Sequence, residues 1–527
     1  MTGYLALVLH AHLPFVRHPE HERFLEEDWF FEAITETYLP LLDMFERLIR
    51  DGVDFRMTMS MTPPLISMLD DELLRSRYLA HVDRLIELST KEIERTRRED
   101  PAFQELAWWY HRYLSRTRWL FSDRFQCDLV GAFARIQDLG RLEIITCGAT
   151  HGFLPLLRES PAAVRAQIMV ARDHYFARFG RPPRGIWLPE CAYFPGLEEL
   201  LRESEIRFFM LDTHGVRLAE PRPRYGCHAP VYTPAGPAAF ARDPESSSEV
   251  WSAEAGYPGN AVYRDFYRDL GYDRDEEYIA PYIHPDGIRI FTGIKYFAVS
   301  GRGKRKLPYN RVWALAKAAD HAQDFLDKRR AQMRGIHSVL GRPPIVVAPY
   351  DAELFGHWWF EGPMFIEYLL RKIHHDQDDI VVTTPYEYLA REPIQQVANP
   401  ATSSWGEDGY WKVWLNEKND WIYPHLHRAG SRLQDQLRRR RSGASAGEMR
   451  VLRQMARELL LAQSSDWAFL INAGTATEYA TKRFRTHVAR FERLDKMLVA
   501  GAIDQEDLVE IEGRDNIFPR LDLRHWR

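Results

Sequence analysis

Short apolar runs separated by long helical patterns are the main feature of the first 400 residues. The runs are rich in β-branched and aromatic side chains, and most of them end in polar residues. Seven such runs lie at residues 4–9, 55–61, 142–147, 185–188, 207–211, 345–348 and 380–383. Apolar strands that alternate with helices are typical of a parallel sheet covered by helices on both faces. The pattern therefore predicts an α/β fold.

Two stretches between these strands follow other patterns. Residues 70–137 repeat apolar side chains at helical spacing, as at Leu79, Val82 and Leu85, which predicts two or three long helices. Residues 220–259 are rich in Pro, Gly and Ser, which predicts an irregular insertion over the active face.

The last quarter of the chain has a different pattern. After about residue 400 strand patterns stop, and residues 419–500 are mainly helical. The Arg-rich stretch at 438–447 predicts an exposed loop; a solvated helix end explains it better than a site for an anionic polymer. We therefore predict two domains. The first is a catalytic domain over 1–395, with insertions at about 70–137 and 219–300. The second is a helical C-terminal domain over 396–527 that contributes to the cleft.

Polar residues that follow the predicted strands are the candidates for chemistry. In parallel sheets and barrels the active site lies beyond the carboxyl ends of the strands. The residues that would converge there are His10, His151, Glu190, His214 and Asp351. His214 fits a structural role equally well.

Two of these residues are carboxylates in similar surroundings. Glu190 follows Trp187-Leu188-Pro189, and Asp351 follows Pro349-Tyr350, so each comes after a strand and a proline with aromatic neighbours. Glycoside cleavage needs such a pair, about 5 Å apart for retention of configuration or roughly 6.5–9.5 Å for inversion. Taken singly, each is explained as well by an N-cap or a buried ion pair. Together they favour a glycosidase.

Glu353 competes with Asp351 for the role of acid. It would share a strand face with Asp351 if the strand continued. The following Leu354-Phe355-Gly356 instead predicts a turn into a helix, where Glu353 would serve as a capping carboxylate. Asp351 is therefore the predicted acid.

The His10-Ala11-His12 sequence raises the alternative of a metal site, as in metal-dependent sugar deacetylases. Residues two apart share a strand face, and histidine is a common zinc ligand. However, Leu13-Pro14 ends the strand, so His12 is expected to leave the strand line, and no His-x3-His pattern is present. We therefore expect no metal and no cofactor. For His10, and equally for His151, the favoured role is a neutral imidazole that donates to sugar hydroxyls or shifts the pKa of a carboxylate.

The number and placement of the aromatic residues indicate how the surface could bind a ligand. Aromatic residues make up 13% of the chain, and several tryptophans lie in polar, Gly-rich stretches where a core residue is poorly placed. Trp251, Trp405 and Trp414 are of this kind, and Trp187, Trp358 and Trp359 adjoin the carboxylate motifs. The excess is therefore interpreted as stacking surface for sugar rings.

Charge and cysteine usage exclude some partners and favour a location. The formal net charge is −5 and is spread along the chain, so no nucleic-acid partner is expected. No apolar stretch is long enough for a membrane span, and the N-terminus predicts a first strand rather than a signal peptide. Four cysteines without CxxC spacing fit reduced thiols, which favours the cytoplasm.

The motifs together resemble glycoside hydrolase family 57. The resemblance rests on Leu9 to Pro14, Ala149 to Gly152, Trp187 to Glu190, Trp251-Ser252-Ala253, Asp351 to Trp359 and Ser465-Asp466-Trp467. The resemblance extends from residue 4 to about 520. Within the family, the motifs look like those of the α-1,4-glucan branching enzymes and of a related group described as α-amylases. The resemblance implies a (β/α)7 barrel with inserted helices and a helical C-terminal domain. It also implies a retaining mechanism.

The resemblance assigns roles by motif position. It makes Glu190 the nucleophile and Asp351 the acid/base. Together with the aromatic residues beside the carboxylates, the predicted substrate-binding residues are His10, His12, His151, Trp187, Trp251, Trp358, Trp405, Trp414 and Asp466. The implied substrate is an α-1,4-glucan such as amylose, glycogen or a maltooligosaccharide.

The expected activity is branching, in which the cleaved chain moves to a 6-hydroxyl. Related branching enzymes carry a long loop with a functional tyrosine after the fifth strand, whereas residues 219–241 are compact here. This difference keeps α-amylase-type hydrolysis as the alternative, with Tyr225 or Tyr232 as candidate replacements for that tyrosine. A metal-dependent deacetylase and a catalytically silent glucan-binding protein are more remote alternatives.

Overall fold

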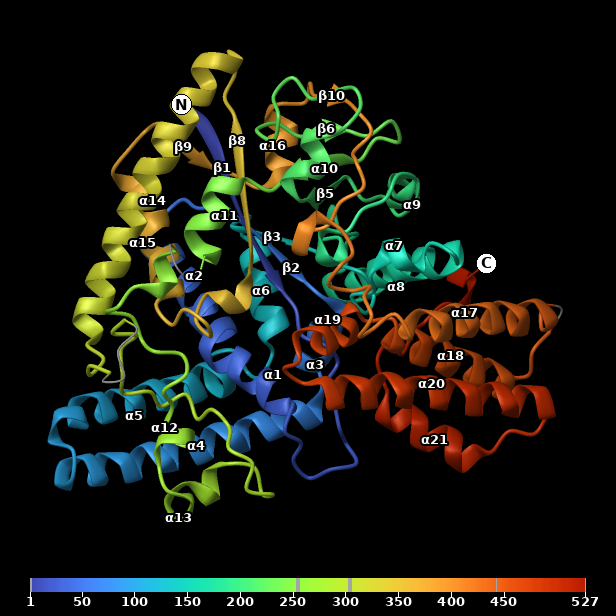
Figure 1. The fold of residues 1–527 in the computed structure, drawn as a ribbon, viewed down its shortest axis with the longest axis horizontal. Helices are drawn as coiled ribbons and strands as arrows, with labels where there is room; N and C mark the ends of the chain where they lie inside the picture. The colour runs from blue at the N-terminus through green and yellow to red at the C-terminus, as the bar shows by residue number, and fades with distance from the viewer. Residues whose placement is uncertain (1, 253–255, 302–305, 442, 527) are drawn as a thin grey trace.

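The computed structural model describes residues 2–252, 256–301, 306–441 and 443–526. Parallel strands lie at the centre, long helices cover them, and a group of helices from the C-terminal quarter packs to one side (Figure 1). Ala253, part of one of the family motifs, lies outside the described residues.

The first sheet is parallel throughout and has β1 at its centre. Its order is β3-β2-β1-β8, with β9 also pairing with β1. The strands are β1 (Gly3–Ala11), β2 (Met57–Met61), β3 (Leu142–Ile145), β8 (Ile345–Asp351) and β9 (Ile380–Val382). β1 is buried along its whole length, as a strand covered on both faces must be. The register sets His10 of β1 beside Asp351 of β8.

The second sheet has the order β10-β6-β7-β5-β4 and is parallel except between β6 and β7. The strands are β4 (Gly185–Ile186), β5 (Phe208–Leu211), β6 (Val231–Tyr232), β7 (Ala238–Ala241) and β10 (Gln396–Val397). All seven predicted strands are thus confirmed. β6, β7 and β10 were not predicted, because each is short and lies close to prolines, which predict turns and not strands.

The strands of the expected (β/α)7 barrel, an incomplete TIM-like barrel, form two sheets and not one closed barrel in the described part of the chain. The two sheets meet through short contacts: a parallel bridge between Thr146 and Ile186, and a hydrogen bond from the Asp243 amide to the Val347 carbonyl of 2.9 Å. β4 is only two residues long, and the chain soon reaches Pro189, which has no amide proton to continue a ladder. What the structure supports is a mixed α/β fold with parallel strands and many helices.

The segment at 220–259 is less irregular than predicted. It contains β6, β7 and the helix α11 (Pro244–Trp251), whose N-cap Asp243 accepts a hydrogen bond from the Ser246 amide. The prediction of an irregular insertion is therefore wrong for these residues. Alanine and serine fill β7 and α11, and their small side chains give neither strand nor helix periodicity.

Helices are confirmed where residues 70–137 predicted them. They are α4 (Glu72–Arg98), α5 (Gln104–Trp119) and α6 (Leu129–Asp138). The side chain of Asp71 caps α4 by accepting a hydrogen bond from the Leu74 amide. In Figure 1, α4 and α5 run side by side across the base of the molecule.

The C-terminal quarter is helical, as predicted. It contains α17 (Ile422–Arg439), α18 (Ala446–Ala462), α19 (Ser465–Ala473), α20 (Thr477–Ala500) and α21 (Gln505–Arg514). α18 and α20 pack together, and α19 lies on the side that faces the strands (Figure 1). The Arg-rich stretch begins at the C-terminal end of α17. A domain boundary at residue 396 stays a prediction.

The remaining helices connect and cover the strands. They are α1 (Glu27–Ala33), α2 (Leu39–Arg50), α3 (Pro63–Leu69), α7 (Leu154–Leu157), α8 (Pro161–Phe179), α9 (Leu197–Glu203), α10 (Thr213–Arg217), α12 (Leu270–Asp273), α13 (Glu276–Ile279), α14 (Arg311–Leu340), α15 (Gly362–His375) and α16 (Pro385–Arg391). Across the described ranges, the structure contains no helix with the length and apolar character needed to span a membrane.

Candidate active site

Glu190 lies in a strained turn just after β4. It belongs to a short 3-10 helix, η4 (Pro189–Cys191), and its φ of 60° is in the left-handed region. A non-glycine residue there costs about 1–3 kcal/mol and persists only where its surroundings hold it. His151 has a similar φ of 59°. Two strained residues side by side in one buried group indicate a site whose geometry serves function.

The Glu190 carboxylate is held by two hydrogen bonds from distant parts of the chain. Trp405 donates its indole Nε1–H to Oε2 at 2.9 Å, and Ser465 donates its hydroxyl to Oε1 at 2.8 Å. The Trp405 amide also donates to the Glu190 carbonyl at 3.0 Å. Burial raises the pKa of Glu190 above its usual value, while the hydrogen bonds from Ser465 and Trp405 oppose that rise by stabilising the charged form.

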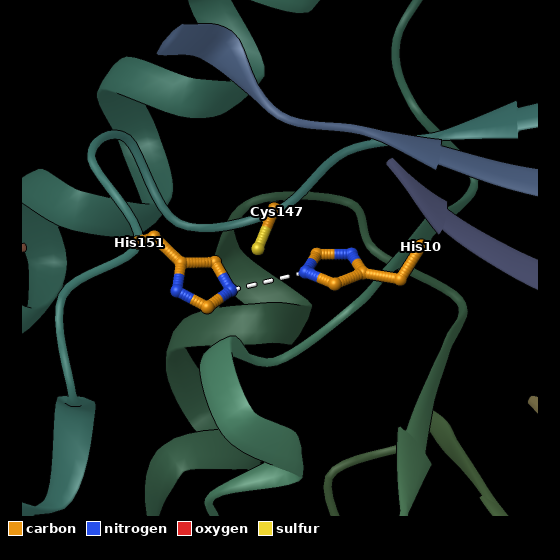
Figure 2. A group of neighbouring side chains, drawn as sticks. All are labelled: His10, Cys147 and His151. Carbon is orange, nitrogen blue, oxygen red and sulfur yellow. Dashed lines mark hydrogen bonds between the residues drawn. The ribbon is translucent and has the colours of Figure 1, made fainter. Parts of the chain in front are cut away.

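His10 and His151 lie edge to edge, and His151 is next to Glu190. Their Nε2 atoms are 3.1 Å apart, and Cys147 lies beside both (Figure 2). The Nδ1 of His10 is 3.2 Å from the Ser60 hydroxyl, and the Nδ1 of His151 is 2.9 Å from the Ser465 hydroxyl. Burial lowers the pKa of both imidazoles well below 6.5, so both are neutral at neutral pH.

His12 and Asp466 form an ion pair beside this group. His12 Nε2 lies 3.1 Å from both Asp466 oxygens, and the His12 ring stacks on His151 with centroids 3.8 Å apart. Although burial favours the neutral imidazole, the charge of Asp466 raises the pKa of His12 above its usual value. For Asp466 the opposite holds: burial is outweighed by His12, and its pKa falls to about 2. His12 does leave the strand, as predicted, because β1 ends at Ala11.

Asp351 ends β8 and faces a cavity. Within the described residues its carboxylate makes no hydrogen bond to the protein. Burial, followed by the negative charges of Glu353 and Glu190, raises the pKa of Asp351 well above 3.8. The surroundings of Asp351 therefore favour its protonated form, and no hydrogen bond to the described residues engages its carboxyl group.

Glu353 also lines the cavity but is engaged elsewhere. It accepts hydrogen bonds from the hydroxyl of Tyr38 and from the amide of His12, the latter at 3.3 Å. Burial raises its pKa to about 7. Glu353 lies in the first turn of a short 3-10 helix, η7 (Ala352–Leu354), as predicted, and it also ties the end of β1 to Tyr38.

The cavity measures about 670 Å³, enough for a chain of sugar rings. Its lining includes His12, Trp251, Phe266, Asp351 and Trp358. Trp251 is 37% exposed and Trp358 is 52% exposed, and Trp358 stacks on Phe266 at 4.2 Å. These three rings give the cavity an accessible aromatic rim on the side of Asp351.

Three other tryptophans are too deeply buried to stack on a ligand. Trp187, Trp359 and Trp414 are 0%, 1% and 2% exposed. Trp187 stacks on His10 at 4.6 Å and Trp414 stacks on Phe153 at 4.5 Å. The prediction that these three offer open faces to a sugar is therefore wrong, because other rings and the core cover them. Trp405 is half-buried and lies between Trp187 and Trp251.

Three further candidates lie away from the carboxylates. His214 bonds Asp212 and the Gly409 carbonyl, which is a structural role. Tyr225 contacts Arg342, before the start of β8 and hence at the opposite end of that strand from Asp351. Tyr232 lies in β6 and packs against a buried cluster. Neither tyrosine lines the cavity, so neither replaces the loop tyrosine of related enzymes in this structure.

Sequence reasoning missed two serines. Ser60 is, with Thr58, one of two polar residues in the buried strand β2, and Ser465 begins α19. A polar position in a fully buried strand was the available signal for Ser60. For Ser465 the signal was its place in Ser464-Ser465-Asp466, a polar stretch between apolar helical segments.

Three groups of side chains within the described ranges have ligand atoms within 4.8 Å of one another, close enough to hold a metal ion. They are His10, Cys147 and His151; His12, His151 and Asp466; and Glu458, His487 and Asp515. The second group is already joined by the ion pair, and the third by a 2.7 Å contact between His487 and Glu458.

Comparison with known proteins agrees with this geometry. Residues 6–400 match the family model for glycosyl hydrolase family 57, and residues 425–526 match the model for the C-terminal part of 1,4-alpha-glucan branching enzymes. A 1,4-alpha-glucan branching enzyme of Thermococcus kodakarensis is 33% identical over 98% of this chain and 78% of its own length.

Two crystal structures are similar over essentially the whole chain. An α-amylase from Thermotoga maritima has a TM-score of 0.93 and 44% identity, covering 100% of this chain and 99% of its own. A branching enzyme from Pyrococcus horikoshii has a TM-score of 0.90 and 33% identity, covering 100% and 97%. Because the family model spans most of the sequence and the fold agrees throughout, this chain belongs to glycosyl hydrolase family 57.

Proposed function

We propose that this protein is a retaining α-1,4-glucan branching enzyme. It cleaves an α-1,4-glucosidic bond, holds the freed chain as a glycosyl-enzyme, and transfers that chain to a 6-hydroxyl. Relatives named as branching enzymes, together with the match of residues 425–526 to the C-terminal model, support this assignment.

In the first step Glu190 attacks the anomeric carbon of the donor glucan. The bond from that carbon to the departing oxygen breaks, and Asp351 gives its proton to that oxygen. The product is an ester between Glu190 and the glucan. In the second step the 6-hydroxyl of an acceptor attacks the same carbon. The Asp351 carboxylate takes the proton of that hydroxyl, and Glu190 leaves.

The proposal rests mainly on one observation: the protein surrounds the two carboxyl groups differently. Glu190 receives two hydrogen bonds that favour its charged form. Asp351 receives none from the described residues, and burial, followed by the charges of Glu353 and Glu190, raises its pKa well above 3.8, which favours the protonated form. A retaining glycosidase needs one carboxylate and one carboxylic acid, and pairs of environments that push two pKa values apart identify such roles.

The aromatic rim supports an α-glucan as substrate. Trp251, Phe266 and Trp358 present apolar faces to the cavity that holds Asp351, and pyranose rings have apolar CH faces to stack on them. Amylose, glycogen and maltooligosaccharides all offer such rings. His12 and Asp466 then act as polar contacts near the donor, supplied partly by the C-terminal helices.

The proposal is tested by proton NMR of amylose incubated with the enzyme. New anomeric signals of α-1,6 linkages without a matching rise in reducing ends are expected. The Glu190→Gln variant is the control and should give neither product. Reducing ends without α-1,6 signals would reject branching.

Hydrolysis is the second candidate, and two observations favour it. The structure of an α-amylase matches this chain at 44% identity, and the segment after β5 is compact, with neither of its tyrosines at the cavity. In that case water replaces the 6-hydroxyl in the second step, and Glu190 and Asp351 keep the same roles. The same NMR experiment separates the two activities.

A further inference from the structure

We infer that a directed chain of hydrogen bonds runs from Ser60 through His10, His151 and Ser465 to Glu190, and that Ser465 is a positioning residue for the nucleophile. The inference rests on the proposed role of Glu190. It assigns the two histidines to the protein's own network instead of to direct contact with sugar hydroxyls. It also makes the first residue of α19 part of the machinery that orients the nucleophile.

Every link in the chain is at hydrogen-bond distance. Ser60 Oγ lies 3.2 Å from His10 Nδ1, and His10 Nε2 lies 3.1 Å from His151 Nε2 (Figure 2). His151 Nδ1 lies 2.9 Å from Ser465 Oγ, which lies 2.8 Å from Glu190 Oε1. All five side chains are buried, so water does not compete freely for these bonds.

The direction of the chain follows from counting protons, beginning at the carboxylate. An ionised Glu190 only accepts, so the single hydroxyl proton of Ser465 goes to it. Ser465 Oγ must then accept from His151, which places the proton of that neutral imidazole on Nδ1. The Nε2 of His151 is left as an acceptor, so His10 carries its proton on Nε2 and uses Nδ1 to accept from Ser60. The Ser60 hydroxyl lies 3.2 Å from that nitrogen and 3.5 Å from its other acceptor, the Thr146 carbonyl, so the shorter bond goes to His10. Each group donates once, and each donation points towards Glu190.

Ser465 is fixed in place by its main chain as well as by its hydroxyl. Its amide donates to the His151 carbonyl at 3.0 Å, and the neighbouring Ser464 forms a bridge with Gly152. The strained backbone of His151 and the start of α19 therefore hold each other in position. This arrangement aims the Ser465 hydroxyl at one oxygen of Glu190, while Trp405 holds the other.

The same group offers a rival interpretation as a metal site. Cys147 lies beside the two Nε2 atoms, and two imidazoles with a thiolate are a ligand set that suits zinc. Burial raises the pKa of the Cys147 thiol well above 9, which disfavours the thiolate. The proton count explains the His10 to His151 contact without an ion. Zinc binding is therefore an outcome of the test and not the inference.

The test is a Ser465→Ala variant of the full chain, with Ser204→Ala as a matched control. Ser204 is equally buried but donates to the Leu200 carbonyl, outside the site. An activated α-glucosyl fluoride, whose leaving group needs no proton, reports the rate of glycosyl-enzyme formation by mass spectrometry. Losing a hydrogen bond to a charged group is expected to slow that step about ten- to a hundredfold in Ser465→Ala. Ser204→Ala should match the wild type.

The pH profile of kcat/KM is a second measurement. It would not change if Ser465 only supported the fold. Besides Ser465 and Trp405, the groups facing Glu190 are His151, His12, Asp466 and Asp351. Removing the Ser465 donor leaves these groups in place and destabilises the charged carboxylate. The acidic limb of kcat/KM should therefore move to higher pH in Ser465→Ala. In the double variant with His151→Ala, the slowing of ester formation should be less than the product of the two single effects, because both act through one bond.

The outcomes separate failure of the inference from failure of the proposed function. If the wild type forms no ester on Glu190, the proposed function fails. If the wild type forms it and Ser465→Ala forms it at the same rate with the same pH profile, the hydrogen-bond chain is overturned. Equilibrium dialysis against zinc tests the rival interpretation as a metal site. One equivalent of zinc bound by the wild type and lost in Cys147→Ser would also overturn the inference, whereas no retained zinc supports it.

Discussion

The two carboxyl groups of the site differ in how the protein surrounds them. Glu190 lies in a strained turn and is clamped by Trp405 and Ser465, which come from 215 and 275 residues further along the chain. Asp351 continues a regular strand and receives no hydrogen bond from the described residues. One carboxylate is oriented by many partners, and the other is left free for the substrate.

This difference shows how one site gives two similar groups opposite tasks. Hydrogen-bond donors stabilise charge, so the bonds from Ser465 and Trp405 oppose the rise in the pKa of Glu190 that burial causes. Burial without donors, beside Glu353 and Glu190, stabilises the protonated form of Asp351. The surroundings of Glu190, the proposed nucleophile, therefore depend on tertiary contacts, whereas those of Asp351, the proposed acid, depend mainly on burial without hydrogen-bond donors from the described residues.

Removing the nucleophile should have the largest effect. Glu190→Gln keeps the size and the hydrogen-bond acceptor of the side chain but cannot form the ester, so turnover of amylose should fall by about 10⁴-fold or more. Product formation by NMR measures the loss, and retained amylose binding with an unchanged circular dichroism spectrum shows that the fold is intact. Near-normal activity would contradict the assignment of Glu190.

Removing the acid should be costly only when the leaving group needs a proton. Asp351→Asn should slow cleavage of maltooligosaccharides by about 10²- to 10⁴-fold, the usual contribution of general acid catalysis. Ester formation from α-glucosyl fluoride should be much less affected. Equal impairment with both substrates would show that Asp351 does more than donate a proton and would weaken the contrast with Glu190.

One of the two hydrogen bonds to the Glu190 carboxylate can be removed while an aromatic side chain is kept at position 405. Trp405→Phe deletes the Nε1–H donor but keeps an aromatic ring beside Trp187 and Trp251. Losing one hydrogen bond to a charged group should lower kcat/KM about ten- to a hundredfold. Trp421→Phe, at a tryptophan whose Nε1–H donates to the Lys418 carbonyl outside the site, is the matched control. An effect of the same size in both variants would mean that the Trp405 bond is not specific to the nucleophile.

Aromatic residues on the two sides should respond differently to truncation. Trp187 is buried behind the Glu190 side, so Trp187→Ala should lower the free energy of unfolding by about 3–5 kcal/mol. Trp358 is exposed on the Asp351 side, so Trp358→Ala should leave stability unchanged and raise KM for amylose about two- to tenfold. Denaturant unfolding and steady-state kinetics measure the two effects. A stability loss in Trp358→Ala would show that this ring belongs to the core.

The smallest expected effect is a shift in pH dependence. Activity needs ionised Glu190 and protonated Asp351, so it should fall at low pH through the pKa of Glu190 and at high pH through that of Asp351. Glu353→Gln removes a negative charge that helps to raise the pKa of Asp351. The basic limb of kcat/KM should therefore move to lower pH, while the acidic limb stays. A fixed basic limb would indicate that Asp351 is not the group that titrates there.

Much of the fold could be predicted because strands and helices are specified locally. Each of the seven predicted strands is present, since buried parallel strands are continuous apolar runs. β6, β7 and β10 were missed because each is short and lies close to prolines, which predict turns. How the strands of the predicted barrel join could not be predicted, because the two sheets meet through short contacts, near Thr146 and Ile186 and near Asp243 and Val347, between residues distant in sequence.

By itself, the sequence determined the parallel α/β fold, the helical C-terminal quarter and the two carboxylates at strand ends. These follow from periodicity and from residue types that stand next to each other in the chain. Only the tertiary structure decided which tryptophans remain open to a ligand, and which donors reach Glu190. Burial of Trp187 and Trp414, and the approach of Ser465, depend on residues that are distant in sequence. Those contacts form when the C-terminal helices pack against the strand ends, and no local pattern records them.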